Sequence, residues 1–300
     1  ASSHGILEMA WWLLLTALLC AYLPFYLTGA QYTGKWCIPS FTSYRVWRWV
    51  WHRFWGLPLS ECRWNVDDFS DKSKRYIFGS HPHGVMSLHH IGPMLCPSVC
   101  EPGKSFSDLS PISTRRDLAA SILFRIPFLR ELALLAGAVD ADRKVASRLL
   151  SEGYSLGIMV GGEQEQILAR QGCQLAFVQQ RKGHVKLALR FGVSLVPCYC
   201  FGETDLYYQS AFAMGLRRWV VKMFGIAITL PIGRNALLPF LPKPVKLFHC
   251  VGKPIPVPQV AEPTEAQVTH YHELYIAGLR AVFEENKDAC GYPNAELMIV

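Results

Sequence analysis

An uncharged run near the start of this 300-residue chain limits what it can fold into. No Asp, Glu, Lys or Arg occurs from Met9 to Gly34. A helix needs about 20 apolar residues to cross the hydrocarbon core of a bilayer, so the run is long enough to span one. The alternative is a buried core helix. Pro24 lies inside the run, so a kinked single span and a shallow re-entrant hairpin both remain open.

The flanks of the run favour an anchor over a cleaved leader. A secretory signal peptide begins with basic residues, whereas only His4 and Glu8 precede the run, and Trp11 and Trp12 interrupt it. Basic residues follow it instead, at Lys35, Arg45, Arg48 and Arg53. Because basic residues stay on the cytosolic side, we expect the rest of the chain to face the cytosol.

The segment 44–56 interleaves aromatic and basic side chains. Its sequence is YRVWRWVWHRFWG, with Trp and Phe alternating with Arg and one His. Trp at the headgroup level with Arg reaching for phosphates is typical of a segment that lies in the membrane interface. A buried amphipathic helix is the alternative. With the anchor just upstream, we expect residues 1–56 to attach the protein to the membrane and residues 57–300 to form a single folded domain.

The composition excludes a disordered chain and one that binds nucleic acid through a known motif. Hydrophobic residues make up 51% and charged residues 18%, and the net charge is +7. A basic and apolar chain suits anionic lipid surfaces or anionic ligands. The ten cysteines contain no CxxC pair and no spacing typical of zinc sites. We therefore expect reduced, mostly buried thiols and no metal.

The body of the chain alternates predicted strands and helices. Short apolar runs predict strands at 75–79, 136–139, 156–160 and 193–200, and amphipathic spacing predicts helices at 117–135, 142–153 and 183–192. Such alternation predicts an α/β fold with a mostly parallel sheet covered by helices. Chemistry in these folds lies at the carboxyl ends of the strands.

Three loops follow predicted strands: SHPHG, GGEQE and FGE. In the first, His81 and His83 flank Pro82 and precede Gly84. A histidine can take a proton from an alcohol that attacks an acyl carbonyl. In the second, Glu165 could orient such an imidazole, as a carboxylate does in acyl-transfer triads.

Glycines and cations near these loops suggest an anionic ligand. The backbone amides of Gly161 and Gly162 could bind phosphate or a developing oxyanion. Positive charge gathers near the loops at Arg143, Arg181, Lys182 and Lys186, with Gly183 between them. A solvated helix face is one explanation. A cradle for the phosphates of a coenzyme A thioester is the other.

A competing motif is Gly153-Tyr154-Ser155-Leu156-Gly157, which matches the G-x-S-x-G elbow of serine hydrolases. That elbow requires a strand before the serine and a helix after it. Here a predicted helix precedes Ser155 and a predicted strand follows. The order is reversed, which disfavours a Ser155 nucleophile.

Several long motifs resemble the type-2 diacylglycerol acyltransferase family, which includes monoacylglycerol acyltransferases and wax synthases. They are YIFGSHPHGVMS, GAVDADRKVASRLL, VGGEQE and RKGHVKLALRFGVSLVPCYCFGE. The resemblance runs from about residue 55 to the C-terminus. It departs from the wider glycerolipid acyltransferase pattern at Met86, where that pattern has Asp, and at His184, where the family often has Phe.

The resemblance implies transfer of a fatty acyl group from acyl-CoA to diacylglycerol at the endoplasmic reticulum, with lipid droplets as an alternative location and the acyltransferase domain in the cytosol. It assigns His81 as the base, Glu165 as the orienting acid and His83 as part of the HPHG motif. Acyl-CoA is then a co-substrate, no bound cofactor is required, and a homo-oligomer is left open. Monoacylglycerol or a fatty alcohol as acceptor, a serine hydrolase, and a non-catalytic lipid-droplet protein are the alternatives.

Overall fold

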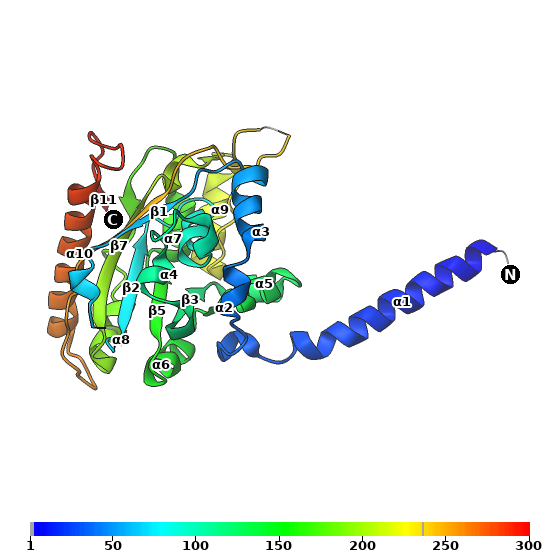
Figure 1. Cartoon of the computed structure of the whole chain (residues 1–300), viewed down its shortest axis with the longest axis horizontal. Helices are drawn as coiled ribbons and strands as arrows, with labels where there is room; N and C mark the ends of the chain where they lie inside the picture. The colour runs from blue at the N-terminus through cyan, green and yellow to red at the C-terminus, as the bar shows by residue number, and fades with distance from the viewer. Residues whose placement is uncertain (1–2, 72, 236) are drawn as a thin grey trace.

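A seven-stranded sheet forms the centre of the protein in the computed structural model, which describes residues 3–71, 73–235 and 237–300. The strand order is β1-β10-β7-β2-β5-β3-β4 (Figure 1). The strands are β1 (Glu61–Arg63), β2 (Tyr76–His81), β3 (Arg115–Ala119), β4 (Ala138–Asp140), β5 (Ser155–Met159), β7 (Ser194–Phe201) and β10 (Phe248–Val251).

Most of the sheet is parallel, which brings several strand ends to one edge. Strand β2 lies between β5 and β7 and is parallel to both, with Ser80 level with Met159 and His81 level with Tyr199. Strand β3 is parallel to β5 and to β4. Only the pairing of β10 with β7 is antiparallel within this sheet. The loops after β2, β5 and β7 therefore meet at the carboxyl edge.

Two small sheets lie outside the main one. Strand β6 (Leu175–Ala176) pairs in parallel with β11 (Met298–Ile299), and β8 (Tyr208–Gln209) pairs antiparallel with β9 (Pro231–Ile232). The first ties the chain's last residues to the segment after Glu165.

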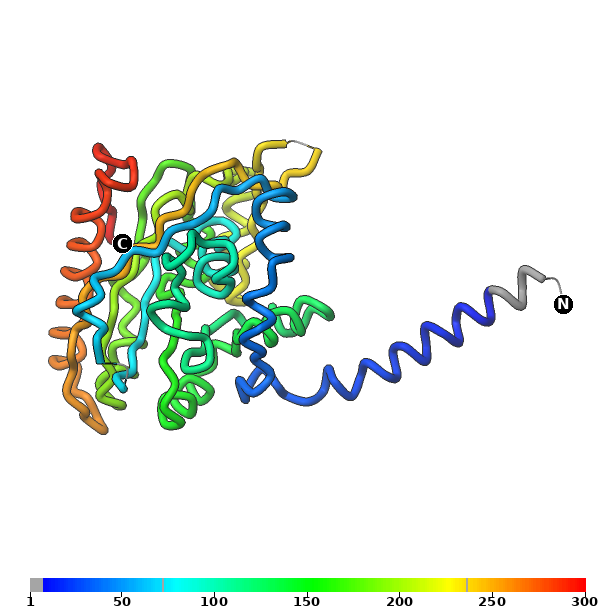
Figure 2. The backbone as a smooth tube through the Cα atoms, viewed as in Figure 1, coloured from blue at the N-terminus to red at the C-terminus, as the bar shows by residue number. Residues whose placement is uncertain are grey.

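Helices and apolar side chains cover both faces of the sheet (Figures 1 and 2). One core cluster joins the sheet to α6 (Arg143–Ser151), α8 (Gly183–Phe191) and α10 (Glu265–Asn286). A second cluster on the other face takes residues from 47–57, 85–109 and α4 (Phe106–Leu109). The remaining helices are α2 (Pro39–Thr42), α3 (Arg45–Trp49), α5 (Leu129–Leu135), α7 (Gly162–Leu168) and α9 (Met214–Phe224). The predicted α/β fold with a mostly parallel, helix-covered sheet is confirmed.

Helix α1 (Ser3–Tyr26) extends away from this body (Figure 2). Residues Glu8–Tyr32 are long and apolar enough to cross a membrane, and only 6% of their most apolar window is buried. Near its C-terminal end the helix contacts the body, where the Tyr22 hydroxyl donates to Glu131 at 2.7 Å and its ring stacks on Phe128. Pro24 is accommodated inside the helix.

The predicted helix at 117–135 is wrong over its first half. Residues 115–119 form strand β3, a 3-10 turn follows at Ser121–Arg125, and only Leu129–Leu135 are α-helical. The reason is a buried ion pair: Arg115 and Asp117, two residues apart, project from the same face of the strand. The Arg115 Nη2 lies 3.1 Å from the Asp117 carboxylate, and both side chains are fully buried.

The aromatic-basic segment 44–56 divides its side chains between the body and the surface. It forms α3 and a π-helical turn, Val50–Phe54. Trp51 is buried in the second core cluster, and its indole N–H donates to the Pro58 carbonyl at 2.9 Å. Val46, Trp49 and Phe54 are exposed. The segment is therefore attached to the body while presenting a second apolar side.

The Arg115–Asp117 pair yields a stability prediction. Asp117→Ala leaves a buried guanidinium without its counter-charge, which typically costs about 3–5 kcal/mol. We expect the thermal unfolding midpoint of the detergent-solubilised protein to fall by on the order of 10 °C. The control is Glu284→Ala, which removes the exposed pair with Lys287. Exposed pairs contribute little, so an equal loss in both variants would contradict the prediction.

Candidate active site

His81 and Glu165 form a buried pair at the carboxyl edge of the sheet. His81 is the last residue of β2, and Glu165 lies in the first turn of α7, which follows β5. The His81 Nδ1 lies 2.8 Å from Glu165 Oε2, and both residues are at most 1% exposed. Strands β2 and β5 are parallel neighbours, with Ser80 level with Met159. His81 and the start of α7, which follows β5, therefore lie at the same edge of the sheet.

The Glu165 carboxylate has three donors. Besides His81, the backbone N–H of His83 donates to Oε1, and the backbone N–H of Phe177 donates to Oε2 at 2.6 Å. Burial raises the pKa of Glu165, but the neighbouring His81 and these hydrogen bonds outweigh it, and the net pKa is lowered. Glu165 is therefore ionised. Gly161 packs directly against the carboxylate, and any side chain there would occupy its place.

The second ring nitrogen of His81 is available for chemistry. An ionised Glu165 accepts from Nδ1, which assigns the proton to Nδ1 and leaves the lone pair on Nε2. That Nε2 is buried and has no hydrogen-bond partner among the described residues. An unpaired imidazole nitrogen in such a place can accept a proton from a bound hydroxyl group.

His83 has a different environment from His81. Its side chain is half-buried, and its Nδ1 lies 3.3 Å from the Gly84 carbonyl. Its backbone amide, rather than its ring, contacts Glu165. The peptide bond between His81 and Pro82 is cis. The two histidines predicted from the HPHG motif are thus brought to one site, with only His81 in the carboxylate pair.

Aromatic and imidazole rings back His81 on the α10 side. The Tyr275 hydroxyl donates to the Gly79 carbonyl at 3.0 Å, and its ring lies 6.4 Å from that of His81. His184 packs edge-on against Tyr275 at 4.6 Å. Burial lowers the pKa of His184 to about 3, so this imidazole is neutral. The ring at position 184 therefore serves as a packing surface behind the site.

A second buried carboxylate, Glu203, is a residue that the sequence analysis did not assign. Its oxygens accept from the backbone N–H groups of Leu88 at 3.0 Å and His89 at 2.8 Å. Its side chain also lies against Gly84, whose φ of +65° favours glycine. Glu203 therefore holds the turn that follows HPHG. The FGE loop after a predicted strand was the signal that could have identified it.

Burial also determines the charge states of Glu203 and of His89, whose imidazole lies beside it. It raises the pKa of Glu203 to about 8 and lowers the pKa of His89 to about 3. The His89 Nδ1 lies 3.3 Å from Glu203 Oε2. At neutral pH the His89 imidazole is uncharged, so this contact is a neutral polar one and not a salt bridge.

The predicted cations divide between two helix starts. Arg181 lies over the ring of Phe177 at 5.4 Å, next to the amide that donates to Glu165. Lys182 donates to Thr269 Oγ1 at 2.9 Å. Gly183 and Lys186 are exposed at the start of α8, and Arg143 is exposed at the start of α6. Helices α6 and α8 pack against each other.

Ser155 lies at the opposite end of the sheet. It is the first residue of β5, is buried, and accepts a hydrogen bond from the Tyr76 amide at 3.1 Å. Met159 lies four positions further along the extended strand, a distance of about 13 Å. Helix α6 precedes it and strand β5 follows, the reverse of a nucleophile elbow.

The chain has relatives among known proteins. The chain is similar to 2-acylglycerol O-acyltransferase 3 of Homo sapiens, at 39% identity over 73% of this chain and 67% of that protein. It is also similar to acyl-CoA wax alcohol acyltransferase 2 of Mus musculus, at 32% identity over 95% of this chain and 85% of that protein. Among solved structures, it is similar to the 1-acyl-sn-glycerophosphate acyltransferase PlsC of Thermotoga maritima, with a TM-score of 0.47, 15% identity, and 80% of this chain and 78% of that chain covered.

The family comparison covers almost the whole chain. The sequence pattern of the family described as "Diacylglycerol acyltransferase" matches residues 4–300. That range includes the HPHG motif, Glu165 and the FGE loop. The chain therefore belongs to the diacylglycerol acyltransferase family of acyltransferases.

Proposed function

We propose that this protein transfers a fatty acyl group from acyl-CoA to the free hydroxyl of diacylglycerol, producing triacylglycerol at a membrane surface. The observation that carries the proposal is the buried His81–Glu165 pair with an unpaired Nε2. Membership of the family supports the reaction class. His81 is the general base, and Glu165 orients it and stabilises the imidazolium that forms.

The reaction proceeds in one transfer without a covalent enzyme intermediate. The acceptor hydroxyl gives its proton to His81 Nε2 as its oxygen attacks the thioester carbonyl. The tetrahedral oxyanion takes hydrogen bonds from the first-turn amides of α7 at Gly161 and Gly162, which the helix itself leaves unsatisfied. The carbon–sulfur bond then breaks, and the CoA thiolate recovers the proton from the imidazolium.

The remaining predicted residues bind the donor and place the enzyme. Arg143, at the start of α6, and Arg181, Lys182 and Lys186, at or next to the start of α8, would bind the phosphates of acyl-CoA. Residues 1–56 anchor the chain through α1, and residues 57–300 carry the chemistry on the cytosolic side of the endoplasmic reticulum. The acceptor and the acyl chain of the donor are apolar, so a site close to the bilayer reduces the cost of extracting the acceptor.

Monoacylglycerol is a second candidate acceptor. It is favoured by the 39% identity to a protein named 2-acylglycerol O-acyltransferase 3. Monoacylglycerol and diacylglycerol both present a primary or secondary hydroxyl on a glycerol backbone, so the same base serves either of them. They differ in the number of acyl chains that the site must admit.

An acceptor panel tests the proposal. Proteoliposomes with labelled oleoyl-CoA should form triacylglycerol from diacylglycerol faster than they form products from monoacylglycerol or hexadecanol. His81→Ala should lower the rate by on the order of 10³-fold, because the proton acceptor is lost. His270→Ala, at an exposed position on α10, is the matched control and should retain the rate. Full activity in His81→Ala would contradict the mechanism, and a preference for monoacylglycerol would change the acceptor.

The role of Glu165 is separable from substrate binding. Glu165→Gln should lower kcat by on the order of 10²-fold and leave the KM for acyl-CoA roughly unchanged, because the amide cannot stabilise the imidazolium. Glu163→Gln removes a carboxylate two residues earlier on the same helix, without the contact to His81, and should retain kcat. Equal losses in the two variants would indicate a general effect on α7.

Glu203 predicts a pH dependence of stability. Its folded pKa of about 8 lies above the unfolded value near 4.5, so the unfolded state ionises first as the pH rises. Its contribution to stability is therefore lost progressively up to about pH 8. We expect the unfolding midpoint of Glu203→Gln, which resembles the protonated acid, to fall less than that of the parent between pH 6.5 and pH 8. Parallel curves would show that Glu203 is already ionised in the folded protein.

A further inference from the structure

Two long stretches of the chain carry no acidic residue, and the fold brings them together. No Asp or Glu occurs between Glu8 and Glu61, or between Asp205 and Glu262. The guanidinium of Arg234, in the second stretch, donates to the Phe54 carbonyl in the first at 3.4 Å. The loop at the upper right of Figure 1 accordingly lies beside the α3 segment. The two stretches thus meet at this contact, and both have basic and apolar residues and no acidic residue of their own.

Helix α9 turns its apolar side outward. Leu216, Trp219 and Met223 follow helical spacing and are all more than half exposed. Arg217 points inward instead, where it donates to the carbonyls of Ser210 at 2.7 Å and Ile228 at 2.6 Å. A surface helix of a soluble protein has the opposite arrangement. The arginine also holds the residues on both sides of α9 in place.

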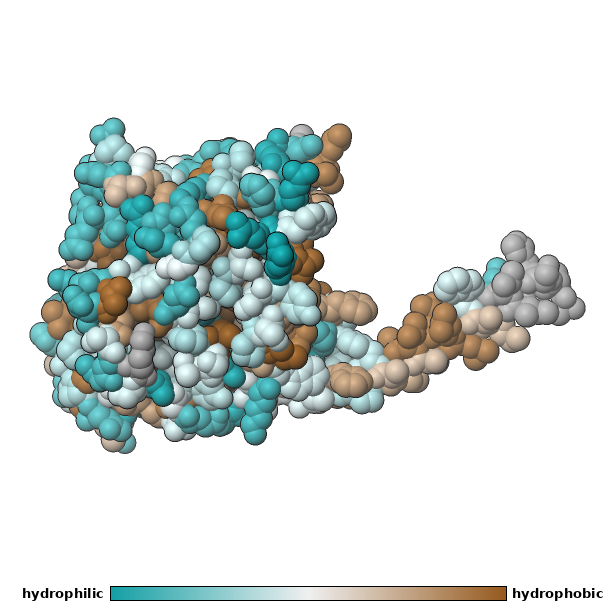
Figure 3. Space-filling view, viewed as in Figure 1, coloured by the Kyte–Doolittle hydropathy of each residue, from teal (hydrophilic) through white to brown (hydrophobic). Residues whose placement is uncertain are grey.

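The loop after β9 presents two leucines at its tip. Its base is closed by hydrogen bonds from the Gly233 amide to the Pro239 carbonyl and from the Arg234 amide to the Leu241 carbonyl. Leu237 is 89% exposed and Leu238 is 43% exposed. Hydrophobic surface is seen at the upper right of Figure 3, where this loop lies. Large aliphatic side chains held out by a closed loop have no packing role within the body.

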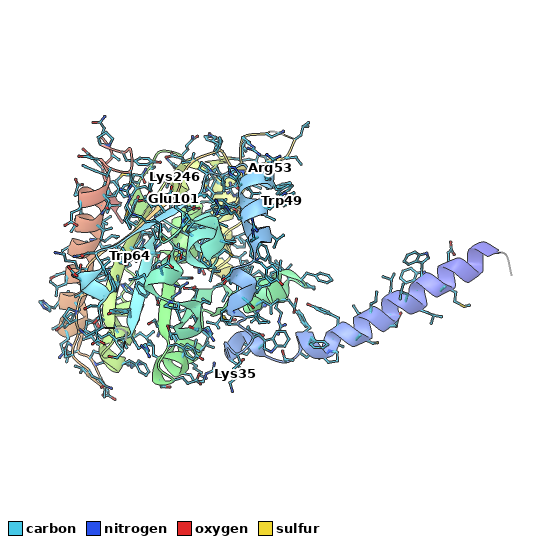
Figure 4. All side chains as sticks on the ribbon, in the orientation of Figure 1. Lys35, Trp49, Arg53, Trp64, Glu101 and Lys246 are labelled. Carbon is cyan, nitrogen blue, oxygen red and sulfur yellow. The ribbon has the colours of Figure 1, made fainter. Side chains whose placement is uncertain are left out.

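The α3 segment continues this surface toward the anchor. Trp49 and Arg53 project from its outer side, on the side of the body from which α1 extends (Figure 4). Val46 and Phe54 are also exposed there. Helix α5, in contact with α1 through Tyr22 and Phe128, adds further exposed apolar side chains on that side.

We propose that α9, residues 226–235 and 237–240, and the outer side of residues 45–54 form a second membrane contact, which docks in the interface of an anionic bilayer. The charge of this surface indicates an anionic bilayer as its partner. Exposed cations border the apolar side chains, at Arg45, Arg48, Arg53, Arg218, Lys222 and Arg234. Lys and Arg beside exposed Trp, Phe and Leu suit lipid phosphates and acyl chains together. The inference rests on the proposed function only in taking α1 as the anchor.

Docking would bring a substrate-sized cavity to the bilayer. Helix α9 packs against α7, which carries Glu165. A cavity of about 570 Å³ lies where the end of α7 meets the start of α9, with Ala169, Gln209 and Met214 in its lining. Gln209 donates to the Ile167 carbonyl at 2.8 Å, which ties this wall to α7.

Photocrosslinking of the full chain in nanodiscs tests the contact. Benzoylphenylalanine replaces Trp219, Leu237 or, as a control, Leu274, an exposed leucine on α10. With phosphatidylserine present, we expect about fivefold more lipid adducts at 219 and 237 than at 274. The excess should fall in pure phosphatidylcholine or at high salt. Equal adducts at all three positions, or a cross-link to a second copy or another protein in place of lipid, would overturn the proposal.

A double variant tests whether this surface contributes to catalysis on membrane-borne substrate. Leu237→Asp/Leu238→Asp should raise the apparent KM for vesicle-borne diacylglycerol about tenfold, because the charges oppose insertion, and should spare the rate with a water-soluble short-chain diacylglycerol. Leu274→Asp should change neither rate. An unchanged KM for the vesicle-borne acceptor in the paired variant would contradict the proposal. If the parent transfers no acyl group but forms lipid adducts, the proposed function fails and the docking surface stands.

Discussion

The hydrogen bonds to the Glu165 carboxylate connect the parts of the site. One carboxylate accepts from His81 at the end of β2, from the amide after Pro82, and from Phe177 on the way to α8. A buried charge is costly unless it is paired and fully hydrogen-bonded. These donors come from two separate stretches of the chain, residues 81–83 and Phe177, so the ionised Glu165 requires both of them in place. Loss of this one group would release the imidazole, the HPHG turn and the segment leading to the predicted CoA edge.

The parallel sheet explains why such distant residues meet. His81 and Glu165 are 84 positions apart, and Glu203 lies further along still. Each follows or ends a neighbouring strand in the order β5, β2, β7, so all three project from the same edge. The two carboxylates then take different states from similar burial. Glu165 has a histidine partner and is ionised, whereas Glu203 has only backbone donors beside a neutral His89, and its pKa is raised to about 8.

The sequence predicted those parts of the structure that short patterns determine. Apolar runs located β2, β5 and β7 to within two residues, and the strand-end rule brought His81 and Glu165 to one edge. The failures have a common physical cause. Apolar spacing predicts a helix over residues 117–135, whereas Arg115 and Asp117 form their ion pair in a strand. That pair can be recognised only once the burial of both side chains is known. Glu203 was overlooked because its partners are backbone amides, which no side-chain pattern reveals.

Membrane attachment at two places would also constrain how the body is oriented. A single helix leaves a body free to rotate about its axis, so the catalytic edge could face the cytosol as easily as the lipid. Contact of the outer sides of α3 and α9 with the membrane would remove that freedom, because a body that is also held away from the α1 axis cannot rotate about it. The inward-facing Arg217 is consistent with this demand, since it stabilises a helix whose apolar side is turned away from the core. An acyltransferase that takes one substrate from water and the other from the bilayer needs such a fixed orientation.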